Sequence, residues 1–519
     1  MTDLIYPNLF LFLYDLGEGL GESKEDLEKN RKIFASKLPE HLRDSLFNLD
    51  NVMETEYLEL LTQRIEYFCD DIPDEGYYYP VRLNDTYGLL IAASFLNNKT
   101  RHPTNSIAEL KNQIEAKLKD SSGKIQTGNL GQTWLVLAEL ANNKNPEEIA
   151  KQCCEKLNLG FDWKEDLQGQ GKLLGGTIFE LRQYGITMSE KIDFSPSATK
   201  PKIEEIQKNN HLIISLYPNE QTAKKAAEFN FDLLRLLCYL HKVFWAYAQS
   251  RYLKELLKKS AIEIQQYIQE IQKYQNPSLN LKPLQKILVK SQTTLYNYSI
   301  NLGYFDSQIR TIEINLLNYQ RRLDTIREKA TSKALENLLP ENIPTPISQF
   351  SKLTINGEDI SSILASLINT AGVTTDLKFF EKFPQEITEK YLLQMQKDYA
   401  NLSPNLKLLE DLINSIRGIT EIEQTESDRN FQELVAIIGV GLGAGASVAS
   451  ISGHFPYVID TAKASHHPVG KFLSKYSVPE PWLAPGTSII LSLLASVIGI
   501  VGVKLWWYIT KKWEQNSRQ

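Results

Sequence analysis

The stretches LVAIIGVGLGAGASVASI (434–451) and LAPGTSIILSLLASVIGIVGV (483–503) are long, apolar and free of charged side chains. A helix needs roughly 20 mostly apolar residues to cross a bilayer, and each stretch is close to that length. The mean hydropathy of the whole chain, −0.30, is ordinary for a soluble protein. We therefore predict a large water-soluble body carried on two C-terminal transmembrane helices. A buried helical hairpin is the alternative.

Residues that flank these stretches favour a membrane interface. Aromatic residues and lysines are enriched where helices leave the bilayer, and here they are Trp482, Trp506, Trp507, Tyr508, Trp513, Lys511 and Lys512. The N-terminus has no basic segment followed by an apolar one, so it does not resemble a signal peptide. We expect a multi-pass protein of the inner (plasma) membrane, in contact with membrane lipid, with both termini in the cytoplasm.

Composition argues against several other classes of function. The net charge over 519 residues is −6, and no basic patch interleaved with aromatic residues indicates a nucleic-acid partner. The cysteines, Cys69, Cys153, Cys154 and Cys238, have no C-x-x-C spacing, so we expect reduced, mostly buried thiols. No Ser/His/Asp or Cys/His arrangement can be assembled from the sequence, so we expect no catalytic site and no enzyme activity.

Two glycine-rich segments are only superficially similar to phosphate-binding loops. GEGLGE (17–22) lacks the full G-x-G-x-x-G spacing, and GQGKLLGG (169–176) has no Ser or Thr after Lys172. We interpret both as turns. His211 and His241 lie in apolar patterns and are expected in the core. The pair His466 and His467 lacks a third ligand, so we interpret it as an exposed loop pair. We assign no metal ligands and expect no cofactor.

Short apolar and β-branched runs predict an N-terminal α/β domain over residues 1–218. The predicted strands are Leu9–Leu13, Tyr77–Leu83, Leu89–Phe95, Trp134–Leu140, Thr177–Leu181 and Leu212–Leu216, with helices at Lys24–Leu38 and Ile107–Leu118.

Residues 219–338 are predicted to form a long helical hairpin. No proline or glycine occurs from Glu220 to Gln275, which predicts one long helix that begins after Asn219 as its N-cap. In the next helix, apolar residues alternate steps of three and four at Leu295, Tyr298, Leu302, Phe305, Ile309, Ile312, Leu316, Tyr319, Leu323 and Ile326. Such a repeat keeps one seam facing a partner. We expect an antiparallel coiled-coil hairpin, with a parallel dimer through the same seam as the alternative.

The remaining segments complete an α+β membrane protein. We expect a proline-rich connector over 339–383, with a short helix over Ile360–Asn369, and stalk helices over 384–433. A domain of two transmembrane helices with a basic tail follows over 434–519. Leu406, Leu409, Ile413 and Ile416 form an apolar stripe at helical spacing. The stalk helix is expected to continue into the first transmembrane helix without a break.

Small residues repeat along the first predicted span. Gly439, Gly443 and Ser447 lie four apart, as do Gly441, Gly445 and Ala449. Small residues at this spacing flatten a helix face, so that another backbone can approach closely. We expect these residues to pack the helices of a homo-oligomer or to line its axis. Packing against the second span alone is the alternative.

This order of segments resembles the CorA family of divalent-cation channels. That family has an N-terminal cytoplasmic domain, a long helical hairpin and a stalk helix that becomes the first of two C-terminal spans. The most specific local match is VPEPWLAPGTSIILSLLASVIGIVGVKLWWYITKKW (478–513), in which Pro479, Glu480 and Trp482 take the places of the family's loop motif. The resemblance implies transport of a divalent metal ion such as magnesium, gated from the cytoplasmic domain, with the cation as a transported or regulatory ion.

The chain departs from the family at its signature. The family has Gly-Met-Asn after the first span, whereas this chain has Ser452, Gly453, His454 and Phe455. The resemblance places Gly453, His454 and Glu480 at the outer mouth. The departure supports an alternative from another class, which is a non-conducting, membrane-tethered sensor or scaffold whose N-terminal domain binds a ligand or partner.

Overall fold

The structure is a computed structural model that describes 3–19, 21–47, 56–68, 74–95, 100–141, 144–188, 192–194, 201–273, 281–336, 354–355, 358–359, 374–423 and 475. The chain divides into two compact units. The first comprises Met1–Ile192, Lys200–Gln249 and Arg310–Leu392, and the second comprises Asp193–Thr199, Ser250–Ile309 and Leu393–Gln519.

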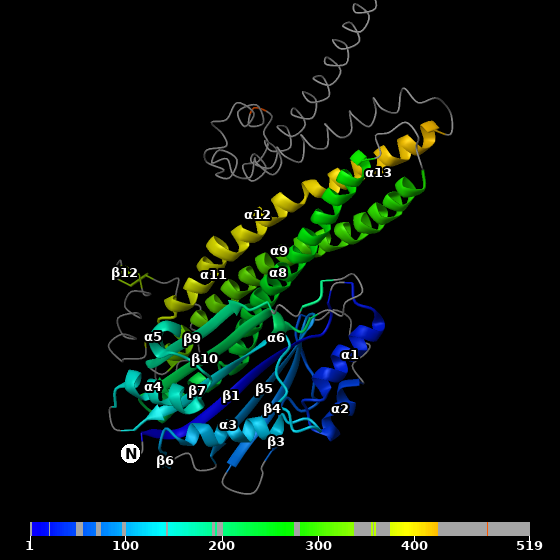
Figure 1. Ribbon diagram of the computed structural model, residues 1–519. Coiled ribbons are helices and arrows are strands. Elements are labelled where there is room, and N and C mark those ends of the chain that lie inside the picture. The colour runs from blue at the N-terminus through cyan, green and yellow to red at the C-terminus, as the bar shows by residue number, and fades with distance from the viewer. Residues whose placement is uncertain are drawn as a thin grey trace, which may run out of the picture. The chain divides into compact units, whose positions relative to one another are not determined.

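A ten-stranded sheet forms the centre of the first unit (Figure 1). Its strands are β1 (Leu4–Leu16), β2 (Leu58–Glu59), β3 (Glu66–Phe68), β4 (Asp74–Leu83), β5 (Thr86–Phe95), β6 (Arg101–His102), β7 (Gly131–Leu140), β8 (Leu167–Leu173), β9 (Gly176–Ile186) and β10 (Gln207–Tyr217). Their order is β2-β4-β5-β1-β7-β10-β9-β8, with β3 beside β4 and β6 beside β1. The six predicted strands are confirmed. Within the described sheet only β7 and β10 pair in parallel, so the unit is α+β rather than α/β.

Both faces of the sheet are covered. Helices α1 (Lys24–Ala35), α2 (Glu40–Phe47), α3 (Ser106–Lys117) and α4 (Pro146–Leu157) contribute to one core, together with Leu9, Leu11 and Leu13 of β1. The alternate residues of β1 point to the opposite face, where the Tyr14 hydroxyl donates to the Leu234 carbonyl at 2.7 Å. Burial on both faces explains why β1 reads as a nearly continuous apolar run.

Two long helices, α8 (Asn230–Lys273) and α9 (Leu281–Glu336), form the predicted hairpin. In the first unit, Glu228 pairs with Lys333, and Asp232 pairs with Lys329 at 2.9 Å. In the second unit, the Thr294 hydroxyl donates to Glu263. The residue numbers of the partners run in opposite directions, so the helices are antiparallel, as predicted.

The predicted seam of α9 is confirmed. The nine seam positions from Tyr298 to Ile326 are all buried, and the seam residue Leu295 is half-buried. On α8, Leu257, Ile264 and Ile271 are buried as well. The prediction of one unbroken helix from Glu220 is wrong, because α7 (Glu220–Ala227) ends before α8 begins. The break buries Phe229 in the core of the first unit.

A third helical segment packs in the second unit. It consists of α12 (Leu393–Leu402) and α13 (Pro404–Glu423). The Tyr298 hydroxyl of α9 donates to the Leu402 carbonyl at 2.7 Å. Leu409, Ile413 and Ile416 of the predicted stripe are buried, and Leu406 is half-buried. Pro404 is the first residue of α13, a position where proline costs no helical hydrogen bond.

Helical structure begins before the predicted start of the stalk. A 3-10 turn, η2 (Lys378–Glu381), leads into α11 (Lys382–Glu386) and then into a π-helical stretch, η3 (Ile387–Leu392). The expected connector therefore ends earlier than residue 383. The predicted short helix over Ile360–Asn369 lies outside the described residues.

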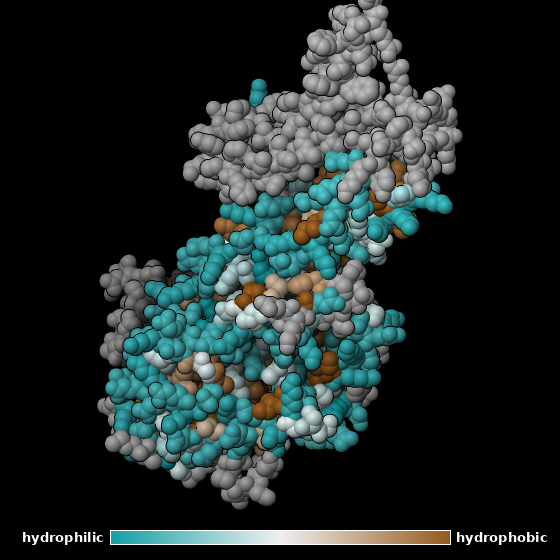
Figure 2. Space-filling view, viewed as in Figure 1, coloured by the Kyte–Doolittle hydropathy of each residue, from teal (hydrophilic) through white to brown (hydrophobic). Residues whose placement is uncertain are grey.

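No helix in the described part of the chain is long and apolar enough to cross a membrane. Both predicted spans, 434–451 and 483–503, lie outside that part. The described surface in Figure 2 is mainly hydrophilic, with scattered apolar side chains.

The glycine-rich stretch 169–176 forms more than the predicted turn. Only Leu174 and Gly175 make the turn between β8 and β9, both with positive φ, as a tight hairpin requires. The backbone of Lys172 exchanges two hydrogen bonds with Asp376, at 2.7 and 2.8 Å. A Cβ atom at Gly171 would lie 2.2 Å from the Asp376 carbonyl oxygen and 2.6 Å from the Phe379 ring. The glycines therefore let residues 374–380 lie directly on β8.

We predict that Gly171→Ala lowers the free energy of unfolding by about 1–3 kcal/mol, because the added methyl group overpacks this contact. Gly185→Ala is the matched control, since a Cβ atom there meets nothing within 4 Å. Urea denaturation followed by circular dichroism measures both variants. Equal stabilities of the two variants would contradict the docking of residues 374–380.

Candidate functional site

The site residues predicted from the sequence lie outside the described residues. They are Gly439, Gly441, Gly443, Gly445, Ser447, Gly453, His454 and Glu480. The candidate site within the described residues is a buried polar network in the sheet of the first unit.

Three neighbouring strands bring the network together. In β10, His211 lies opposite Thr133 of β7 on one side and opposite Arg182 of β9 on the other. Glu180 lies two residues before Arg182, so both side chains point to the same face of the sheet. His241 of α8 reaches the same group of side chains.

Four hydrogen bonds link these side chains into a chain. Asn209 Nδ2 lies 3.1 Å from His241 Nδ1. His241 Nε2 and His211 Nδ1 each lie 2.8 Å from the Thr133 hydroxyl. His211 Nε2 lies 3.0 Å from a Glu180 carboxylate oxygen. The hydroxyl of Thr133 therefore joins two imidazole rings.

The charge of the network is concentrated at Glu180. Burial by itself would raise the pKa of this carboxyl group. The hydrogen bond from His211 and the positive charge of Arg182 outweigh that effect, so the pKa of Glu180 is lowered. Burial, together with the nearby His211, holds the pKa of His241 well below its ordinary value. Glu180 is thus ionised and His241 is neutral.

Arg182 connects Glu180 to the segment that follows η2. One guanidinium nitrogen lies 3.9 Å from Glu180, and the other donates to Glu386 of α11 at 2.8 Å. The guanidinium also lies over the rings of Phe244 and Phe383, with centroids 5.4 and 5.1 Å away. A desolvated cation between two rings gains from both.

The order Thr133, His211, Glu180 is a hydroxyl, an imidazole and a carboxylate, the groups of a Ser-His-Asp triad. All three side chains are at most 1% exposed, so the hydroxyl contacts no solute in this conformation. The expectation that His211 and His241 are core residues is confirmed. Their partners were missed, although polar residues two apart in an apolar strand, as at Glu180 and Arg182, are a signal of such a network.

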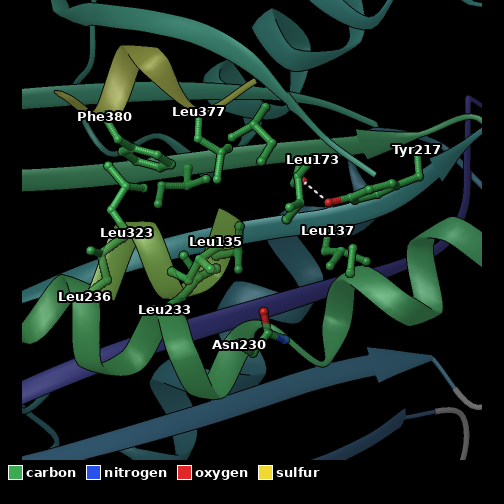
Figure 3. A pocket seen from close by; sticks show the side chains of 15 residues that line it. Leu135, Leu137, Leu173, Tyr217, Asn230, Leu233, Leu236, Leu323, Leu377 and Phe380 are labelled. Atoms are coloured by element: carbon green, nitrogen blue, oxygen red, sulfur yellow. Dashed lines mark hydrogen bonds between the residues drawn. The ribbon is translucent and has the colours of Figure 1, made fainter. Parts of the chain in front are cut away.

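An apolar cavity lies on the same face, farther along β7, β9 and β10 (Figure 3). Its lining includes Leu135, Ile213 and Phe380, and its free volume is about 20 Å³, roughly the room that one water molecule needs. Asn230 also lines it, at 1% exposure, and neither polar atom of its side chain has a partner among the described residues.

Neither a metal site nor a disulfide is found in the described residues. No group of three or more His, Cys, Asp or Glu side chains there is placed to hold a metal ion. Cys153, Cys154 and Cys238 are free and buried, as predicted, and burial raises the pKa of each thiol. Cys69 lies outside the described residues.

Comparison with known proteins adds no assignment. No protein-family model, no curated protein and no solved structure matches this chain.

We predict that Asn230→Leu raises the free energy of unfolding by about 1–3 kcal/mol, because it removes a buried carboxamide that has no partner. Asn230→Ala is the control, since it removes the same group but enlarges the cavity, and it should be less stable than Asn230→Leu. Thermal unfolding compares the two with the unmodified protein. Destabilisation by Asn230→Leu would contradict this account, because it would reveal a partner for the amide.

Proposed function

We propose that this chain is a CorA-like integral membrane protein that transports a divalent cation of the Mg²⁺ type and is gated from its cytoplasmic sheet domain. The order of segments carries the proposal. A sheet unit is followed by an antiparallel hairpin and by a third helical segment that packs on the hairpin. This segment is described as far as Glu423, and the first apolar run begins at Leu434.

Contacts in the second unit support a mechanical role for the third segment. Asp398 of α12 is 5% exposed and forms ion pairs with Arg251 at 2.6 Å and Lys254 at 2.7 Å, both on α8. Removing one partner of a buried charge pair is strongly destabilising. The contacts therefore resist sliding of α12 along α8. A helix must resist such sliding in order to transmit a movement.

The membrane part of the proposal rests on the sequence. In a homo-oligomer, Gly439, Gly441, Gly443, Gly445 and Ser447 would pack the first spans around a central axis. Gly453, His454 and Glu480 would lie at the outer mouth. Neither apolar run carries a charged residue, so ions would be handled by backbone carbonyls, hydroxyls and water.

One observation favours a second candidate. The stretch Ser452–Phe455 replaces the Gly-Met-Asn signature of the resembling family. A membrane-tethered sensor or scaffold that conducts nothing needs no such signature. Its sheet domain would bind a ligand or a partner, and the helices would hold it away from the bilayer.

Flux measurements distinguish the two candidates. Full-length protein in proteoliposomes is predicted to take up Mg²⁺, Co²⁺ or Ni²⁺ above the level of empty liposomes. Gly441→Leu should abolish uptake, because a large side chain fills the flattened helix face, and His454→Ala should change the preference among ions. Val440→Leu, at the neighbouring position, is the control that should keep uptake. No flux from folded, oligomeric protein would contradict transport and leave the tethered sensor.

A further inference from the structure

The hydrogen bonds of the polar network have one consistent direction when both rings are neutral. The amide nitrogen of Asn209 can only donate, so His241 Nδ1 accepts and its Nε2 carries the proton. His241 Nε2 then donates to Thr133, whose hydroxyl donates to His211 Nδ1. His211 Nε2 donates to the Glu180 carboxylate. In every hydrogen bond of the chain, the donor is therefore the group farther from Glu180.

One added proton reverses most of this chain. If His241 Nδ1 gains a proton, its Nε2 proton passes to the Thr133 oxygen, and the Thr133 proton passes to His211 Nδ1. His211 then carries both ring protons and one positive charge, while His241 is neutral again as the other tautomer. The new Nδ1 proton of His241 is accepted by Asn209 Oδ1 once that amide turns over. Asn209 Oδ1 is buried and without a partner among the described residues.

We propose that Asn209, His241, Thr133, His211 and Glu180 form a proton-coupled switch inside the sheet unit. A single proton enters at the Asn209 end, reverses three hydrogen bonds and leaves its charge on His211 beside Glu180. This inference concerns the first unit alone and does not depend on the proposed transport function.

The two ends of the network suit these roles. Asn209 is half-exposed, whereas Thr133, His211 and His241 are buried, so a proton arrives from the Asn209 side. Gly131 makes room for the contact between Asn209 and His241, because a Cβ atom there would lie 2.3 Å from His241 Nδ1 and 3.0 Å from Asn209 Nδ2. Its φ of +151° is also one that other residues rarely adopt.

The surrounding charges favour His211 as the place where the proton rests. The titratable and charged groups around the network are Glu180 and Arg182 of β9, Tyr14 of β1, Tyr319 of α9, and Lys382 and Glu386 of α11. Among them the Glu180 carboxylate contacts His211 directly, whereas His241 has no carboxylate partner among the described residues. The ring beside the carboxylate therefore gains the most from a positive charge.

Proton uptake also alters the surroundings of Arg182. Glu180 then faces two cations, His211 and Arg182. Its negative charge is divided between them, so Glu180 holds Arg182 less strongly. Arg182 keeps its contact with Glu386, at the end of α11, and η3 begins at the next residue. π-Helical turns are frequently found at functional sites. The switch thus ends where α11 passes into η3.

Nitrogen-15 NMR of the full-length protein, with labelled histidine, tests the proposal between pH 8 and pH 5. His211→Gln and His241→Gln identify the two rings among the seven histidines. At high pH both rings should be neutral with the proton on Nε2. As the pH falls, His211 should become doubly protonated while His241 moves its proton to Nδ1.

Thr133→Val should abolish the tautomer change of His241, because it removes the link between the rings, and Thr133→Ser should keep it. Asn209→Leu, at a half-exposed position, should also abolish it by removing the acceptor. The proposal would be overturned if both rings stayed unchanged until unfolding, if His241 became the charged ring, or if His211 charged without a tautomer change in His241. A tautomer change that survives in Asn209→Leu would overturn it as well.

Discussion

The charge of a carboxylate buried on the face of a sheet must be compensated, and the first unit is built around this requirement. Glu180 is 1% exposed on β9, where an uncompensated charge would cost several kcal/mol. His211 of β10 supplies a hydrogen bond, and Arg182 of β9 supplies a positive charge. Each compensating group needs its own support. Arg182 obtains it from Glu386 and two aromatic rings, and His211 obtains it from Thr133.

This requirement also decides which elements stay together. The network joins β7, β9 and β10 to α8 through His241, and to α11 through Glu386. The backbone pairing of Lys172 with Asp376 holds the start of the same returning segment on β8. The pattern of apolar residues specifies which face of each strand is buried. Directed hydrogen bonds between specific side chains add a further constraint on how the elements of the first unit pair.

Periodicity predicted much of the fold. Short apolar and β-branched runs located the strands β1, β4, β5, β7, β9 and β10, and the steps of three and four located the buried seam from Tyr298 to Ile326. The break before Asn230 was not predictable in this way, because no glycine or proline marks it and the burial of Phe229 is a tertiary effect. The glycines in 169–176 were interpreted as a turn. The residues that fill the space beside them, Asp376 and Phe379, lie some 200 residues later in the chain.

The candidate site was less predictable than the fold. His211 and His241 were placed in the core, but their meeting at Thr133 depends on a parallel pairing of β7 with β10 that adjacent sequence does not reveal. The residues from Gly439 to Ser447 were predicted from the spacing of small residues, and Gly453, His454 and Glu480 from the family resemblance; all of them lie outside the described residues. Sequence patterns thus locate local elements well, whereas contacts across the sheet require the order of its strands.

In this structure Arg182 compensates the charge of the ionised Glu180. The most direct test is a double-mutant cycle with Arg182→Met and Glu180→Gln, in which urea denaturation measures the free energy of unfolding. Arg182→Met alone should cost about 3–5 kcal/mol, because it leaves the buried carboxylate without its cation. Glu180→Gln in the same chain should recover part of that loss, since the neutral amide can still accept from His211. Losses that simply add would contradict the account.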